Sequence, residues 1–146
     1  MMEKARQDLI HKINYLNKEN DALYHQASLK LKMSDSVSIV LYTIYDIGPG
    51  CLLSDVYKSS GISRQTVNSA IRSLEAADIL YLEPYRGRAK RIVLTEKGAQ
   101  YIEETAARLF AAEAAAFDSW TEEEISTHLR LIEKYTACFR REIEKL

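Results

Sequence analysis

The chain has 146 residues, a length that fits a single domain, and 47% of them are hydrophobic, which is enough for a buried core. Its formal net charge of −1 excludes a uniformly basic nucleic-acid binder. The sequence contains no run of about 18 apolar residues that could cross a membrane, and its start lacks the apolar core of a signal peptide. Cys51 and Cys138 lie far apart, without the spacing of metal ligands. We therefore expect a cytoplasmic protein with two structural thiols and neither a metal nor a cofactor.

The first third of the chain predicts two helices. Before residue 34, apolar residues recur at three- and four-residue steps, as in an amphipathic helix. A second helical run covers residues 34–47, where Ser34 or Ser36 can cap the start and Gly48-Pro49 can end it. The stripe of the first helix is Leu9, Ile13, Leu16, Leu23, Ala27 and Leu31, and that of the second is Val37, Val40, Leu41 and Ile44.

Residues 54–76 have the pattern of two short helices joined by a tight turn. The first helix, 54–60, is expected to end at Gly61, because such a turn needs a positive φ that glycine adopts most easily. Ser63 can cap the second helix, and Val67, Ala70, Ile71 and Leu74 form its apolar stripe. The opposite face carries donors and acceptors of the kind that read base edges in a major groove. We expect DNA binding by Ser63, Arg64, Gln65, Thr66, Asn68, Ser69 and Arg72.

A basic hairpin is predicted directly after the second of these helices. Residues 79–83 and 91–94 alternate and are rich in β-branched and aromatic side chains, as antiparallel strands are. The turn between them contains several cations and no acid. Such a hairpin, in this position, indicates the wing of a winged helix-turn-helix, although its charges could also serve only to protect the sheet edges. The DNA-binding residues expected in the wing are Arg86, Arg88 and Lys90.

The chain resembles the multiple-antibiotic-resistance regulator (MarR) family of winged helix-turn-helix transcriptional regulators. The matching residues are Gly61-Ile62-Ser63, Gln65-Thr66-Val67, Leu74-Glu75 and the stretch 88–98, with its closing Leu-Thr followed by Gly98. The resemblance implies a winged unit with helices on both sides, over the whole chain. Two positions depart from the expected pattern. Arg86 stands where the family usually has an aspartate that holds the wing arginines, and Tyr57 stands where helix-turn-helix motifs generally have a small residue.

The last third of the chain predicts two further helices. The first runs from Glu96 to about Asp118 and is rich in alanine, which allows other helices to approach closely. The second follows Thr121, which can form a capping box with Glu124. A small winged unit cannot bury the stripes of both terminal helices, so we expect residues 1–33 and 97–146 to form a dimer interface, although part of each stripe could be intramolecular core. The interface residues expected are Leu9, Ile13, Leu16, Ile125, Leu129, Ile132, Phe139 and Ile143.

The charges of the chain are unevenly distributed. Residues 51–98 contain eight Lys and Arg against five Asp and Glu, whereas residues 99–146 contain six against ten. The positive charge thus concentrates on the winged region, where phosphates would lie. The interpretation is a mainly α fold with a small β-hairpin wing, in which residues 34–96 form a winged helix-turn-helix DNA-binding region between N- and C-terminal dimerisation helices.

The function expected is that of a dimeric, sequence-specific regulator of double-stranded DNA, which represses by occupying a palindromic operator. The alternative is a winged-helix adaptor that binds another protein. The sequence has no glycine-rich phosphate loop, nucleophile elbow or HExxH motif, so we do not expect an enzyme. The resemblance also implies a crevice for a small aromatic or anionic effector, unless the same aromatic residues are only the edges of the core. The residues that could line the crevice are His11, Tyr15, Tyr42, Tyr45 and Arg108.

Overall fold

The structure is a computed structural model that describes residues 1–146. The chain divides into two compact units, Met1–Phe110 and Ala111–Leu146. Its fold is mostly helical with one two-stranded antiparallel hairpin, as the sequence predicts. None of the helices has the length and hydrophobicity needed to cross a membrane. The elements are α1 (Met2–Lys30), α2 (Asp35–Ile47), α3 (Leu53–Ser59), α4 (Arg64–Ala76), β1 (Leu80–Pro84), β2 (Lys90–Leu94), α5 (Glu96–Glu104), α6 (Ala106–Ala116) and α7 (Glu122–Ile143).

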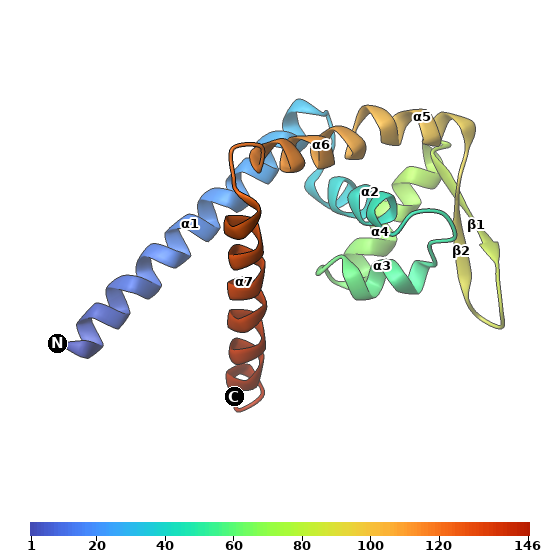
Figure 1. Cartoon of the computed structure of the whole chain (residues 1–146). Coiled ribbons are helices and arrows are strands. Elements are labelled where there is room, and N and C mark those ends of the chain that lie inside the picture. Colours follow the sequence, from blue (N-terminus) through green and yellow to red (C-terminus); the bar gives the residue numbers. More distant parts are fainter. The chain divides into compact units, whose positions relative to one another are not determined.

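Helix α2 lies at the centre of the first unit and packs against α1, α3 and α4 (Figure 1). Ser34 caps its start by accepting a hydrogen bond from the Val37 N–H at 3.3 Å, and Gly48 ends it at φ +85°. The predicted stripe is confirmed, since Val40 and Leu41 have no exposed surface and Ile44 is nearly as buried. Burial of one such side chain stabilises the fold by roughly 1.5–3 kcal/mol.

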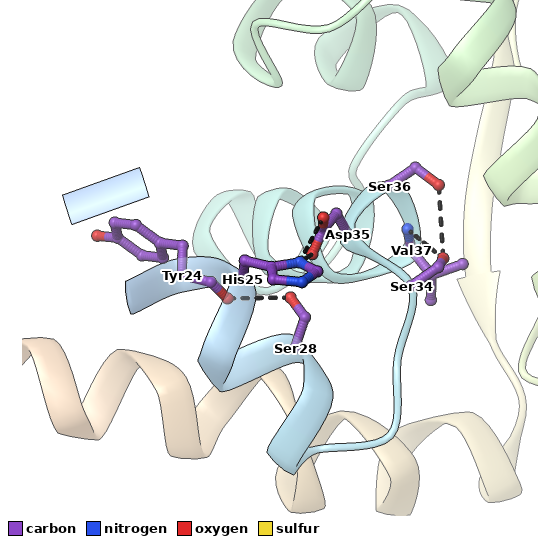
Figure 2. Close-up of polar contacts among 7 residues, drawn as sticks. All are labelled: Tyr24, His25, Ser28, Ser34, Asp35, Ser36 and Val37. Atoms are coloured by element: carbon purple, nitrogen blue, oxygen red, sulfur yellow. Dashed lines mark hydrogen bonds and ion pairs between the residues drawn. The ribbon is translucent and has the colours of Figure 1, made fainter. Parts of the chain in front are cut away.

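A polar contact joins the end of α1 to the start of α2 (Figure 2). Nδ1 of His25 lies 2.8 and 3.0 Å from the two carboxylate oxygens of Asp35. Close by, the Ser28 hydroxyl donates to the Tyr24 carbonyl oxygen at 3.1 Å, so this buried serine has a partner. The His25–Asp35 contact thus links the two helices, whereas residues 2–26 of α1 are exposed.

Helices α3 and α4 form the predicted helix-turn-helix. Gly61 has a φ of +73° in the turn, which explains the need for glycine there. The Ser63 hydroxyl caps α4 by accepting from the Thr66 N–H at 3.1 Å. The predicted apolar stripe of α4 is confirmed, because its four side chains are at most 3% exposed and pack into the core. They are Val67, Ala70, Ile71 and Leu74.

The hairpin formed by β1 and β2, called the wing below, begins within two residues of the predicted bounds. Its register pairs Leu80 with Leu94 and Glu83 with Arg91. The segment before α3 extends the sheet, because the Ile92 N–H donates to the Cys51 carbonyl at 2.9 Å. Leu80 and Ile92 are buried and attach the wing to the core.

A close approach of α5 to the turn between α4 and β1 fixes the base of the wing. Thr95 caps α5 through the Gly98 N–H at 2.9 Å, and its hydroxyl donates to the Asp78 carbonyl at 2.6 Å. A Cβ atom at Gly98 would lie 1.7 Å from the carbonyl oxygen of Ile79. Only glycine therefore fits here, which gives a physical reason for the Leu-Thr and Gly98 pattern in the sequence.

The single helix expected from Glu96 to about Asp118 is interrupted in the structure. Helix α5 ends at Glu104, and α6 begins at Ala106. Between them Thr105 has φ −125° and ψ −87°, and its hydroxyl donates to the Tyr101 carbonyl at 2.7 Å. A threonine that bonds back to the preceding turn often bends a helix. The alanine content of this segment, which favours a helix, did not reveal the break.

In the second unit, α7 begins as the sequence predicts. Thr121 and Glu124 form the capping box, with reciprocal hydrogen bonds of 3.1 and 3.0 Å. Before and beside it, the rings of Phe117, Trp120 and His128 pack edge to face or tilted within 6.3 Å of one another. No residue of α7 is buried.

The first prediction concerns Gly98. Gly98→Ala should lower the free energy of unfolding by about 3 kcal/mol or more, because a backbone carbonyl must move to admit the methyl group. Gly87→Ala is the matched control. Gly87 has φ +56° but open space around it, so the change should cost only about 1–2 kcal/mol. Urea unfolding of both variants measures the difference, and equal losses would contradict the close approach.

The second prediction concerns pH. Burial, with a smaller effect of the Asp55 carboxylate, raises the pKa of the Cys51 thiol from 9.0 to about 11. The folded state therefore holds this proton more tightly, so the stability it contributes is complete below about pH 9 and is lost as the pH rises to about 11. Between about pH 8 and about pH 10.5 the loss should be about 2 kcal/mol. Urea unfolding should show this loss in the wild type relative to Cys51→Ala. A constant difference between them would contradict it.

Candidate nucleic-acid interface

One face of α4 points to solvent and carries only polar side chains. Arg64, Gln65, Ser69 and Arg72 are exposed on it, and they are called the reading face below. The Arg72 guanidinium donates to the Ser69 hydroxyl at 3.3 Å. Ser63 and Thr66 are less available, since their hydroxyls are 2.7 Å apart and form part of the cap. The core stripe on the opposite side of α4 leaves this face as the one that can enter a groove.

Tyr57 of α3 contacts two of the predicted DNA-binding residues. Its hydroxyl donates to Oδ1 of the half-buried Asn68 at 2.5 Å. The guanidinium of Arg64 lies over its ring, 4.5 Å from the centroid. Asn68 thus differs from its neighbours on α4, because its amide oxygen already has a partner within the protein. The large residue at position 57, unusual for the motif, fills the space between α3 and the edge of the reading face.

The turn of the wing presents three cations to solvent. Arg86, Arg88 and Lys90 are all exposed, and Gly87 has φ +56° in a turn closed by the Ala89 N–H donating to the Arg86 carbonyl at 2.9 Å. The arginine at position 86, where the resembled family usually has an aspartate, lies over the Tyr85 ring, 5.4 Å from its centroid. The ring that Arg86 covers belongs to the preceding residue of the same exposed turn.

Two carboxylates of the winged region are engaged with partners outside these cations. Glu83 forms an ion pair with Arg91 across the two strands, with Nε of Arg91 2.6 Å from the carboxylate. Asp55 accepts from the Leu52 N–H at 2.8 Å and so holds the start of α3. The cations of α4 and the wing turn form no ion pair, which leaves their charge available for phosphates: Arg64, Arg72, Arg86, Arg88 and Lys90.

The five residues predicted to line an effector crevice lie on three helices, α1, α2 and α6. Tyr42 and Tyr45 pack on Phe110, with ring centroids 6.3 and 5.6 Å apart. His11 and Tyr15 are exposed on α1, and Arg108 is exposed on α6. A cavity of about 550 Å³ lies between the end of α2, the 48–51 loop, the wing and α5, and of the five only Tyr45 lines it. The role of these residues remains a prediction.

The residues predicted for the dimer interface are all exposed, each by 36% or more of its surface. They comprise three on α1 and five on α7. Exposed apolar side chains in such rows are unusual for a monomer and typical of an interaction surface. They are Leu9, Ile13, Leu16, Ile125, Leu129, Ile132, Phe139 and Ile143.

Sequence reasoning missed the aromatic residues that hold the cations. Tyr57 and Tyr85 each lie beneath an arginine, and Arg91 also lies 5.6 Å from the Tyr85 centroid. The unusual size of residue 57 was a visible signal. The Glu83–Arg91 pair could have been found from the register of the hairpin, because directly opposite residues of opposite charge attract each other.

Neither family sequence models nor curated protein sequences give a match to this chain. Solved structures do. A MarR family regulator from Listeria monocytogenes in complex with a 26mer DNA is 20% identical, with a TM-score of 0.70 over 91% of this chain and 89% of that chain. The S. aureus MepR–DNA complex is 19% identical, with a TM-score of 0.68 over 88% and 96%. Bordetella bronchiseptica BpsR, whose DNA binding is regulated by 6-hydroxynicotinic acid, is 21% identical, with a TM-score of 0.65 over 86% and 98%.

Several further MarR family regulators match over most of their length, one of them over the whole of this chain. Two of these similar proteins are described as transcriptional regulators of the MarR family. The helix-turn-helix, the wing and the helices on either side of them therefore make up the winged-helix fold of the MarR family of transcriptional regulators.

Proposed function

We propose that the protein is a transcriptional regulator that binds double-stranded DNA with sequence specificity. The observation that carries the proposal is the reading face of α4, which is exposed, polar and adjacent in the chain to a wing whose cations lack carboxylate partners. Amide and guanidinium groups read base edges, and free cations bind phosphates. The DNA complexes of MepR and of the Listeria regulator, which share this fold, support the same reading.

The proposal favours DNA over a protein partner for α4. Protein interfaces have an apolar or aromatic centre, and none of the exposed large hydrophobic residues lies on α4. A face built of arginine, glutamine and serine meets a groove better than it meets another protein. The adaptor function is therefore the weaker candidate.

The proposed regulator is a dimer. The exposed stripes of α1 and α7 would be covered by a second copy of the chain, because burying them removes a large apolar surface from water. Two copies would place two α4 helices on half-sites about one helical turn, or roughly 34 Å, apart. A palindromic operator would match this symmetry, and occupying it would exclude the polymerase. Repression is therefore the proposed outcome.

We further propose that a small aromatic or anionic effector weakens DNA binding. BpsR, which has this fold, is regulated by 6-hydroxynicotinic acid. In this chain Tyr42, Tyr45 and Phe110 form an aromatic group, and the cavity of about 550 Å³ next to Tyr45 has the size of small-ligand sites. A ligand that fits better to one spacing of the two winged units would shift the dimer towards it.

The third prediction distinguishes residues that contact phosphates from residues that contact bases. Arg88→Ala should weaken binding to operator and unrelated DNA alike and lower the salt slope of log K by about one unit, because one phosphate contact is lost. Gln65→Ala should weaken operator binding by about 1–3 kcal/mol and leave non-specific binding nearly unchanged. Fluorescence anisotropy on both DNAs at several salt concentrations measures these effects. Identical behaviour of the two variants would contradict the assignment.

The fourth prediction tests the dimer. Ile143→Asp should dissociate the dimer, because an unpaired charge buried in the interface costs several kcal/mol. Operator affinity should then fall steeply, because a monomer binds one half-site without the added affinity of the second. Lys134→Asp is the control, because Lys134 is exposed nine residues away, on the opposite face of α7. Sedimentation velocity should give a smaller species only for Ile143→Asp. A dimer that persists in this variant, with normal operator binding, would contradict the proposal.

A further inference from the structure

Tyr57 lies on the side of α3 that faces α4, and it contacts two residues of α4. Its hydroxyl is 2.5 Å from Oδ1 of Asn68, and its ring carries the Arg64 guanidinium at 4.5 Å. Tyr57 is half-buried, and the Arg64 guanidinium covers part of its ring. One side chain from the first helix thus connects two residues of the second.

The hydrogen bond determines where the tyrosine ring lies. Asn68 comes from the rigid helix α4 and is half-buried, so its amide gives the Tyr57 hydroxyl a fixed acceptor. Val56, the preceding residue of α3, is fully buried and holds the backbone of Tyr57. With both ends of the side chain held, the ring has little rotational freedom.

The ring in turn restricts Arg64. Arg64 is the first residue of α4, is exposed, and forms no ion pair. A free arginine side chain samples many rotamers and loses that freedom when it binds. The planar guanidinium can stack on an aromatic face and keep its N–H donors at the edges available. Stacking on Tyr57 therefore limits its conformations before any DNA is present and leaves its donors free.

We propose that Tyr57 is a positioning residue that holds Arg64 for contact with a purine base, and that Asn68 acts through Tyr57. The inference rests on the proposed DNA-binding function and deepens it. Arginine donates two parallel hydrogen bonds to O6 and N7 of guanine, and this bidentate contact needs a fixed guanidinium plane. The sequence predicts Asn68 as a DNA-binding residue, but its amide oxygen accepts the hydrogen bond of Tyr57. Asn68 therefore contributes to DNA recognition by positioning Tyr57.

The test is a double-mutant cycle for binding to a selected operator. Arg64→Ala should weaken binding roughly 5- to 150-fold, the loss of a bidentate base contact. Tyr57→Leu should weaken it about two- to fivefold, the value of an exposed cation–π contact. In the Arg64→Ala background, Tyr57→Leu should cause no further loss. Tyr57→Phe keeps the ring and removes only the hydrogen bond to Asn68, so it should weaken binding less than Tyr57→Leu does. Asn68→Ala removes the same hydrogen bond and should weaken binding by a similar factor. The double variant should bind no more weakly than either single variant.

A role of Tyr57 in folding alone would give the same loss in both backgrounds and would overturn the inference. So would tighter binding by Tyr57→Leu, because the ring would then hold Arg64 away from DNA. A second readout needs no DNA. In NMR spectra of the free protein, the δ protons of Arg64 should be shifted upfield by the ring in the wild type and not in Tyr57→Leu. If the wild type lacks the upfield shift, the inference is overturned. If the wild type has the upfield shift but selects no DNA sequence, the proposed function on which the inference rests is overturned.

Discussion

Packing of α4 against α2 fixes which side of α4 remains in solvent. Val40 and Leu41 on α2, and Val67 on α4, have no exposed surface. An α-helix repeats every 3.6 residues, so burying positions 67, 70, 71 and 74 necessarily turns the polar residues between them outwards. The reading face is therefore a consequence of core formation. A rotation of α4 would expose apolar side chains and bury unpaired arginines, and each of these changes costs free energy.

The wing depends on a second constraint, the contact between α5 and the end of α4. Gly98 brings the first turn of α5 against the Ile79 backbone, and Thr95 ties that turn to the Asp78 carbonyl. The Lys97 ammonium adds a hydrogen bond to the Ala77 carbonyl at 2.8 Å. These contacts attach the base of the hairpin to the end of α4. In the proposed regulator, the wing and the reading face would contact DNA together.

Much of this organisation could be predicted from the sequence because it is local. The caps at Ser34, Ser63 and Thr121 follow from hydroxyls placed before apolar periodicity, and the core stripe of α4 follows from its spacing. The break at Thr105 could not, since alanine content favours one helix and the competing hydrogen bond is visible only in the structure. The hydrogen bond between Tyr57 and Asn68 joins residues 11 positions apart on different helices, so no pattern along the chain predicts it.

In the proposed function, α4 and the wing recognise a particular DNA sequence. The most direct test is selection of double-stranded DNA from a random library by the full chain, followed by affinity measurements on the selected and shuffled sequences. We expect enrichment of an inverted repeat with half-sites about one helical turn apart, bound at least about 1000-fold more tightly than shuffled DNA. A library that yields no enriched motif, with equal binding to selected and shuffled DNA, would contradict it.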